Sequence, residues 1–105
     1  MRIVISGATG SIGSQLMERL SSFHEVVGLG RDESKINYMA RRFTMSSCDL
    51  ESEAFETIVA SADCFIHCAA FAAPRGKAAR FQKNVEIVNA VIPVLEINDV
   101  FTIFV

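Results

Sequence analysis

Short apolar runs alternate with amphipathic stretches along the chain. The apolar runs predict strands at residues 2–6, 25–29, 43–48, 64–68 and 100–105. The intervening stretches have helical spacing and predict helices at residues 15–20, within 31–41, at 51–60 and at about 78–96. Strands that alternate with helices of this length indicate an α/β fold with a doubly wound parallel sheet of about five strands, in one domain over residues 1–105.

Two of the predicted helices have a clear apolar side. The first carries one apolar stripe, formed by Ile12, Leu16, Leu20 and Phe23. The helix at 51–60 has an apolar side opposite three glutamates, formed by Phe55, Ile58 and Val59. Pro93 lies inside the last predicted helix, where it lacks an N–H and clashes with the preceding turn, so we expect a kink or an early end there.

A glycine-spaced turn joins the first predicted strand to the first predicted helix. We call residues 7–13 the glycine turn, and its glycines are Gly7, Gly10 and Gly13. Glycines allow close backbone approach, and the free N–H groups and dipole of a helix N-terminus attract anions, so this arrangement predicts a diphosphate site. We expect the N–H groups of Ser11 and Ile12 to bind a pyrophosphate, with Thr9 as a supporting hydroxyl or a helix cap. The alternative is a tight turn that only packs the helix closely on the strand.

The end of the second predicted strand bears on which dinucleotide fits. An acidic residue there would bind the adenosine ribose 2′-hydroxyl, as expected for NAD. That position holds Gly30, and Arg31 follows it. A small residue leaves room for a 2′-phosphate and a guanidinium can bind it, which favours NADP over NAD. The alternative is that Arg31 is a solvated loop residue and that Asp32 serves the ribose of NAD.

A carboxylate ends the third predicted strand. Asp49 can accept a hydrogen bond from an adenine amino group, and we expect the neighbouring Leu50 to belong to the same cofactor-binding site. It is equally suited to cap the helix that is predicted to follow. The two roles are compatible with each other.

Composition and charge restrict the partners that we expect. The 105 residues carry a formal net charge of −2, and 50% of them are hydrophobic. This balance fits a soluble domain and gives no reason to expect a nucleic acid or an anionic membrane as a partner. The longest apolar stretch, residues 64–73, contains a histidine and is too short to span a bilayer. We therefore expect a cytoplasmic protein.

The cysteines lie in apolar, strand-like runs at Cys48, Cys64 and Cys68. An odd number of buried cysteines favours reduced core thiols over a disulfide framework. On a strand, Cys64 and Cys68 share one face while His67 points to the other, so we expect no metal site there.

Four motifs occur in the order and spacing of a known family: the glycine turn, Asp49-Leu50, Asp63-x-Phe65-Ile66-His67-Cys68-Ala69-Ala70 and Asn84-Val85-Glu86. Over all of its length the chain resembles the extended short-chain dehydrogenase/reductase family, which comprises NAD(P)-dependent epimerase/dehydratase-like proteins. The string from His67 to Ala70 is particularly similar to the sterol-dehydrogenase-like branch. The resemblance implies a Rossmann-type fold in which four residues contact the nicotinamide half of the cofactor: Cys68, Ala69, Ala70 and Phe71. Asn84 matches a family asparagine near the cofactor.

Two departures from the family pattern bear on chemistry. The family has Gly-Thr soon after the asparagine motif, whereas this chain has Ile87-Val88. Family members use a Tyr-x-x-x-Lys pair, in which the lysine lowers the tyrosine pKa for general acid–base catalysis. The only tyrosine here, Tyr38, is followed four residues later by Arg42 and lies before the third strand. We therefore assign no catalytic residue and leave open whether this chain is an enzyme by itself.

The resemblance implies the N-terminal, dinucleotide-binding portion of an oxidoreductase or epimerase, truncated after the fifth strand. The intact protein would transfer hydride between NADP or NAD and a small-molecule substrate with a hydroxyl or carbonyl group. A homodimer is left open, because members of the family often dimerise through helices. Two alternatives stand beside this expectation: a noncatalytic NADP-binding or sensing module, and an inactive fragment.

Overall fold

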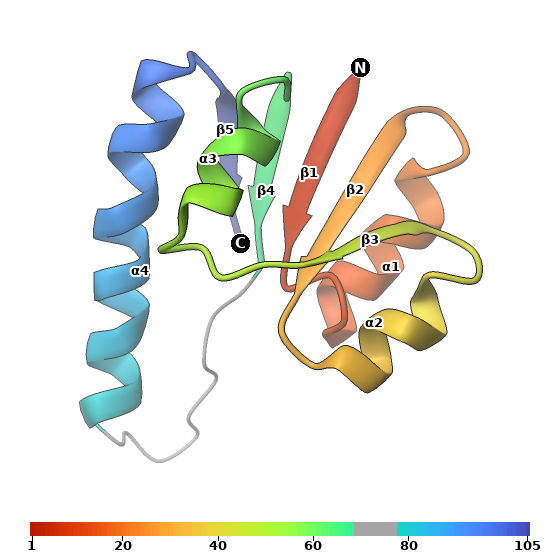
Figure 1. The fold of residues 1–105 in the computed structure, drawn as a ribbon, viewed down its shortest axis with the longest axis horizontal. Helices are drawn as coiled ribbons and strands as arrows, with labels where there is room; N and C mark the ends of the chain where they lie inside the picture. Colours follow the sequence, from red (N-terminus) through yellow and green to blue (C-terminus); the bar gives the residue numbers. More distant parts are fainter. Residues whose placement is uncertain (69–77) are drawn as a thin grey trace.

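The chain forms a parallel sheet with helices on both faces (Figure 1). The computed structural model describes the backbone of residues 1–68 and 78–105 and the side chains of residues 1–68 and 82–105. The described strands are β1 (Arg2–Ser6), β2 (Glu25–Gly30), β3 (Thr44–Ser47), β4 (Cys64–His67) and β5 (Phe101–Phe104). The described helices are α1 (Ser11–Leu20), α2 (Glu33–Met39), α3 (Glu53–Val59) and α4 (Ala78–Ile97). The predicted doubly wound α/β fold is confirmed.

The strand order reverses at β1. The five strands lie in the order β3-β2-β1-β4-β5, and every neighbouring pair is parallel. The chain therefore winds outward from β1 on one side and returns to build β4 and β5 on the other. Ser6, the last residue of β1, aligns with Leu29 of β2 and with His67 of β4. Loops diverge beyond this point, and in open α/β sheets ligands bind in such a crevice.

Helices α3 and α4 cover one face of the sheet. Phe55 of α3 and Val91 of α4 are fully buried there against Val4 and Phe65 of the central strands. The rings of Phe55 and Phe65 meet edge to face, with centroids 5.2 Å apart. This geometry is favourable for aromatic pairs, so α3 is anchored directly on the middle of the sheet.

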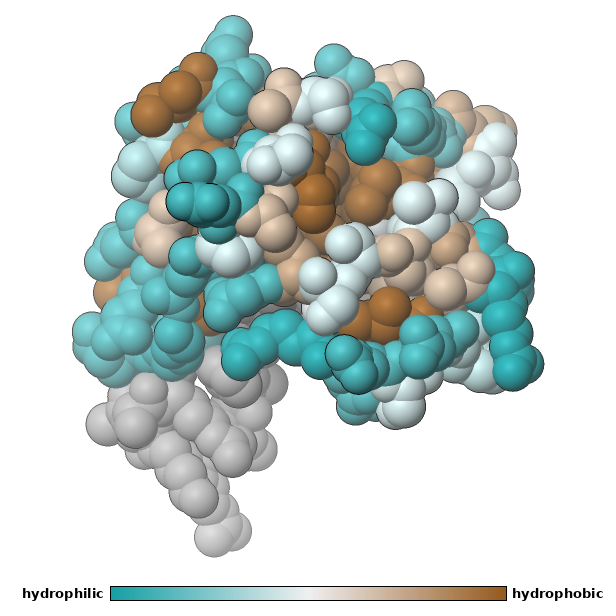
Figure 2. Space-filling view, in the orientation of Figure 1, coloured by the Kyte–Doolittle hydropathy of each residue, from teal (hydrophilic) through white to brown (hydrophobic). Residues whose placement is uncertain are grey.

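Helices α1 and α2 cover the opposite face. Met17 of α1 is fully buried in a cluster with Ile3 and Ile5, and Met39 of α2 packs against the same cluster. Because both faces are covered, the central strands are nearly continuous apolar runs, as is usual for parallel sheets. In the space-filling view, apolar side chains appear in the middle of the face shown, bordered by hydrophilic ones (Figure 2).

Helix α1 presents a different side to the sheet from the one predicted. Leu16 and Leu20 of the predicted stripe do pack against the core. The prediction is wrong for the other two members of the stripe, because Ile12 is 54% exposed and Phe23 is 82% exposed. The reason is local. The close packing of the helix begins at Gly13, which is buried against Gly7 and Ala8, and the helix ends at Leu20 before it reaches Phe23.

Helix α4 continues through Pro93 to Ile97. The early end that we expected at this proline is therefore wrong. Three side chains on successive turns are buried against the sheet: Ile87, Val91 and Leu95. This packing holds the helix in place across the missing N–H of the proline. No helix among the described residues is both long and apolar enough to cross a membrane.

Helix α4 ends in a left-handed residue. Asp99 has φ of 52°, the only positive φ of a non-glycine residue in the described ranges. The N–H of Val100 donates to the carbonyl of Leu95 at 3.0 Å, and the N–H of Asp99 donates to that of Glu96 at 3.2 Å. These two bonds form a Schellman C-cap, a motif that usually has glycine at the left-handed position.

Candidate functional site

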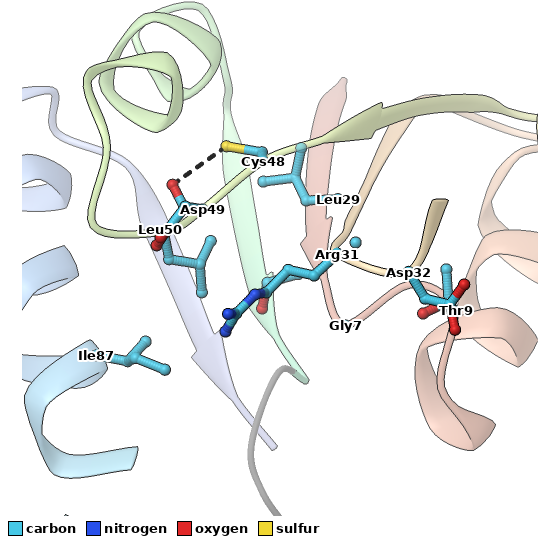
Figure 3. Close-up of a pocket in the computed structure, with 11 residues that line it drawn as sticks. Gly7, Thr9, Leu29, Arg31, Asp32, Cys48, Asp49, Leu50 and Ile87 are labelled. Carbon is cyan, nitrogen blue, oxygen red and sulfur yellow. Dashed lines mark hydrogen bonds between the residues drawn. The ribbon is translucent and has the colours of Figure 1, made fainter. Parts of the chain in front are cut away.

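A pocket of about 530 Å³ opens at the carboxyl ends of β1, β2 and β3 (Figure 3). Its wall consists of strand ends, the loops that follow them and one side chain of α4. The lining residues are Ser6, Gly7, Thr9, Leu29, Gly30, Arg31, Asp32, Cys48, Asp49, Leu50 and Ile87. The pocket therefore lies beside the point where the strand order reverses, with an apolar interior and charged groups at the loops.

The glycine turn forms one edge of this pocket. Gly7 has φ of 66°, a left-handed conformation that side chains disfavour. The N–H of Gly10 donates to the carbonyl of Gly7 at 3.0 Å and closes the turn. A Cβ on Gly13 would lie 2.1 Å from that same carbonyl oxygen. Gly13 is therefore needed so that α1 can start directly against the turn.

Helix α1 begins with open backbone donors. Its N-cap is Gly10, which makes no side-chain capping bond, so the alternative role of Thr9 as the cap is wrong. The first N–H groups of a helix have no partner within the helix. Those of Ser11 and Ile12 open this helix, and they fall where a bound anion would gain from the helix dipole.

At the end of β2, Gly30 is closely surrounded by other side chains, whereas the next residue, Arg31, is exposed. A Cβ on Gly30 would lie 3.0 Å from Thr9 Cγ2 and 3.3 Å from Ile36 Cγ1. A larger side chain at this position would thus require its neighbours to shift. Arg31 is exposed, and its guanidinium extends across the pocket towards Leu50 (Figure 3).

Asp32 is occupied as a helix cap. Its Oδ1 accepts hydrogen bonds from the Ser34 N–H at 3.0 Å, the Ser34 hydroxyl at 2.7 Å and the Lys35 N–H at 3.3 Å. The Ser34 hydroxyl bond is the main cause that lowers the pKa of this carboxyl. One oxygen of Asp32 is therefore committed to starting α2, although the residue also lines the pocket.

The loop after β3 is folded by Asp49. Its Oδ1 accepts from the Glu51 N–H at 2.9 Å, and its carbonyl accepts from the Cys48 thiol at 3.4 Å (Figure 3). Helix α3 begins only at Glu53, with Ser52 as its N-cap. The alternative role of Asp49 as the helix cap is therefore wrong. Instead, Asp49 shapes the loop that turns Leu50 into the pocket.

An ion pair ties this loop to α4. The ammonium of Lys83 contacts the carboxylate of Glu51, and this bond is the main cause that raises the pKa of Lys83. Lys83 also lies 4.0 Å from Glu86, one turn further along α4. The pair joins the loop after β3 to the helix that contributes Ile87, so two walls of the pocket are connected at its rim.

A buried polar pair lies where β1 and β4 end. Ser6 Oγ is 2.8 Å from His67 Nδ1, and the N–H of Cys68 donates to Ser6 Oγ at 3.1 Å. Ser6 lines the pocket, whereas Cys68 is half-buried and lies outside the pocket lining. Burial lowers the pKa of His67, which is therefore neutral at neutral pH.

The pocket brings together some of the residues predicted from the sequence. Five of them line it: Gly7, Thr9, Arg31, Asp49 and Leu50. The others that the structure describes lie outside its lining: Gly10, Ser11, Ile12, Gly13, Cys68 and Asn84. Ala69, Ala70 and Phe71 lie outside the described residues. Binding roles for all of these residues stay predictions.

Several lining residues were missed by sequence reasoning, namely Ser6, Leu29, Cys48 and Ile87. Ile87 was noted only as a departure from the family pattern. It is buried and points at the pocket from α4, opposite Arg31 (Figure 3). Its spacing with Val91 and Leu95 is a signal that could have identified it as inward-facing.

The described residues contain no group of three His, Cys, Asp or Glu side chains that could hold a metal ion. The cysteines at positions 48, 64 and 68 are free thiols. Burial raises the pKa of each thiol. All three are thus poor nucleophiles at neutral pH.

Comparison with known proteins gives a family and a fold. The sequence profile of the NAD dependent epimerase/dehydratase family matches residues 3–105. Among curated proteins, no sequence matches this chain significantly.

Solved structures with the same fold include a UDP-glucose-4-epimerase from Stenotrophomonas maltophila with bound NAD. It is 19% identical with a TM-score of 0.83, and the match covers 99% of this chain and 36% of that one. A UDP-glucuronic acid 4-epimerase from Bacillus cereus in complex with NAD is 22% identical with a TM-score of 0.79, covering 99% and 39%. Serine dehydrogenase from Escherichia coli is 18% identical with a TM-score of 0.71, covering 99% and 61%. The chain thus spans between about a third and three fifths of the length of these proteins.

Proposed function

Because the chain belongs to the NAD dependent epimerase/dehydratase family, we propose that its pocket binds the adenosine diphosphate half of a nicotinamide dinucleotide. The observation that carries the proposal is the continuity of the pocket with the glycine turn. Gly7 and Thr9 line the pocket, and the uncapped start of α1 follows directly. A pyrophosphate on the first N–H groups of α1 would leave the adenosine in the pocket between Leu29, Leu50 and Ile87.

We further propose that the dinucleotide is NADP in preference to NAD. Gly30 leaves no carboxylate at the end of β2, and one oxygen of Asp32 is committed to capping α2. Arg31 supplies a guanidinium at the mouth of the pocket. A 2′-phosphate would form an ion pair and bidentate hydrogen bonds with that group, whereas the neutral 2′-hydroxyl of NAD could form no ion pair with it.

The role of residues 1–105 is then that of a dinucleotide-binding domain within an oxidoreductase or epimerase. When bound, the cofactor supplies hydride transfer to or from a substrate with a hydroxyl or carbonyl group. This chain's own residues would bind and orient the adenosine diphosphate half. Three free thiols fit a reducing compartment, so we place the protein in the cytoplasm.

The test is a calorimetric titration of the protein in its natural length with NADP and with NAD. We expect tighter binding of NADP. Arg31→Ala should weaken NADP binding by about ten- to a hundred-fold, because hydrogen bonds to charged groups contribute about 1.5–3 kcal/mol, and leave NAD binding nearly unchanged. Arg41→Ala is the matched control, since Arg41 is exposed, lies outside the pocket lining and packs over Tyr38.

Two results would contradict parts of the proposal. Equal loss of NADP affinity in both arginine variants would show that Arg31 acts only through net charge. No binding of either dinucleotide would refute the proposed function itself. Tight binding without change in the absorbance of reduced nicotinamide, on any alcohol or ketone tried, would instead favour a noncatalytic dinucleotide-binding module.

A further inference from the structure

The loop between β3 and α3, residues 48–52, forms one wall of the pocket, and we call it the β3–α3 loop. Its start is fixed on the sheet, because the Cys48 N–H donates to the Gly30 carbonyl at 3.0 Å. Its shape is fixed from within, since Asp49 Oδ1 accepts the Glu51 N–H at 2.9 Å. The loop is thus a small folded unit whose far end can be placed by a contact with another element.

The far end of the β3–α3 loop contacts α4 through an ion pair. The ammonium of Lys83 contacts the carboxylate of Glu51, and the carboxylate of Glu86 lies 4.0 Å from the same ammonium. The side chains of Lys83 and Glu51 are 39% and 35% exposed, so water surrounds the two charges only in part. Their attraction is therefore screened less than that of a fully exposed pair, and it holds the loop and the helix together.

The ion pair lies next to two apolar side chains of the pocket. Leu50 precedes Glu51 in the loop, and Ile87 lies one helical turn after Lys83, on the same side of α4. Both apolar residues line the pocket (Figure 3), and both are buried in the same core cluster. The proposed place of the adenosine is between these two side chains and Leu29. Movement of the loop away from α4 would separate Leu50 from Ile87 and widen the pocket where a base would lie.

We propose that Lys83 and Glu51 are positioning residues of the adenosine site, whose ion pair holds the β3–α3 loop against α4. The pair thereby sets the separation of Leu50 and Ile87. The inference rests on the proposed function, because it concerns the same site. Neither charged side chain lines the pocket, so the pair acts on a ligand through these two apolar walls. Its loss should weaken NADP and NAD by the same factor, because both contain the adenosine diphosphate half.

Two variants of opposite charge separate this role from direct attraction of the ligand. Lys83→Ala removes a positive charge and Glu51→Ala removes a negative one, so a general effect of charge on an anionic ligand would have opposite signs in the two variants. A broken ion pair would instead weaken binding in both. The matched controls are Arg42→Ala and Glu18→Ala, because these residues form an exposed ion pair at 2.8 Å and neither lines the pocket.

The measurement is calorimetric binding of NADP and of NAD to the protein in its natural length, with urea unfolding of the same samples. We expect Lys83→Ala and Glu51→Ala each to weaken both dinucleotides by about three- to five-fold, the coupling of a partly exposed ion pair. The double variant should bind no more weakly than either single variant, because each single change already breaks the pair. The control variants should bind both dinucleotides as the wild type does, and all four single variants should unfold near the wild-type midpoint.

The outcomes distinguish the two proposals. A wild-type protein that binds neither dinucleotide would refute the proposed function and this inference with it. If the wild type binds, unchanged affinities in Lys83→Ala and Glu51→Ala would overturn the positioning role alone. So would tighter binding in Glu51→Ala, because Lys83 would then act on the ligand through its charge. A loss confined to NADP, or losses that add up in the double variant, would overturn it as well, because the lysine would then contact the 2′-phosphate or the two residues would act independently.

Discussion

An alanine at position 13 would place a methyl group inside the backbone of the glycine turn. Its Cβ would lie 2.1 Å from the Gly7 carbonyl oxygen and 2.9 Å from Ala8 Cα. Both contacts are with backbone atoms, so no change of side-chain rotamer relieves them. Overpacking costs about 1–3 kcal/mol, and a backbone contact as short as this one lies at the upper end, at about 2–3 kcal/mol, while alanine returns about 1 kcal/mol of helix propensity. We expect Gly13→Ala to lower the free energy of unfolding by about 1–2 kcal/mol.

Gly10→Ala is the matched comparison within the same turn. A Cβ at Gly10 would lie 3.3 Å from the Gly7 carbonyl oxygen, a contact that a shift of a few tenths of an ångström relieves. The backbone there is extended, with φ of −80°, which alanine adopts readily. We expect its unfolding free energy to stay within about 0.5 kcal/mol of the wild-type value, because a weaker N-cap is offset by a stiffer unfolded chain.

Urea unfolding followed by circular dichroism gives both free energies, and a dinucleotide titration follows on the same samples. Gly13→Ala should also weaken dinucleotide binding, because Gly7 must move and it lines the pocket. Equal unfolding midpoints for the two variants would refute the reasoning. So would a Gly13→Ala protein as stable as wild type, since the turn would then not be packed as tightly as the distances imply.

Two further predictions concern stability alone. Asp99→Gly should raise the unfolding free energy by about 1 kcal/mol, because φ of 52° strains an L-residue, whereas Asp99→Ala should lower it; urea midpoints that move the other way would contradict this. Burial lowers the pKa of His67 from its ordinary 6.5, so the unfolded chain binds a proton at this residue more readily than the folded chain. The folded state should therefore have its full stability above about pH 6.5 and lose part of it as the pH falls below that value. Unfolding free energies at about pH 5 and about pH 8 should differ less in His67→Phe than in wild type, and an equal difference would exclude this residue as the cause.

Hydrophobic periodicity was sufficient to predict the elements of the fold. A strand such as β4 is buried on both faces and is therefore a short, mostly apolar run, while α3 shows an apolar side opposite its glutamates. The errors arose where tertiary contacts decided the outcome. Ile12 was placed on the inner face of α1 because the pattern could not show that Gly13 makes the first contact. For Pro93 a kink or an early end of the helix was expected, and the early end was wrong because packing on the sheet does not appear in a local pattern.

The site was predicted in part for a similar reason. Arg31 and Asp49 were identified because residues that follow parallel strands meet at one edge of the sheet. Ile87 was missed because its place over the pocket depends on how α4 packs. The Ser6–His67 pair requires β1 to neighbour β4 in a particular register, and no spacing along the chain encodes that adjacency.

The pocket is assembled from four separate stretches of the chain: the residues around Gly7, Arg31, Asp49 and Ile87. All four stretches meet only when the sheet has formed in its final strand order, so a partly folded chain would lack the complete pocket. A ligand bound there would therefore stabilise only the fully folded state, and its effect on the unfolding free energy would grow with the logarithm of its concentration. If that ligand is the dinucleotide, it would lower the population of unfolded chain on which proteases act. Protection of the chain from proteolysis would then rise with the concentration of the cofactor.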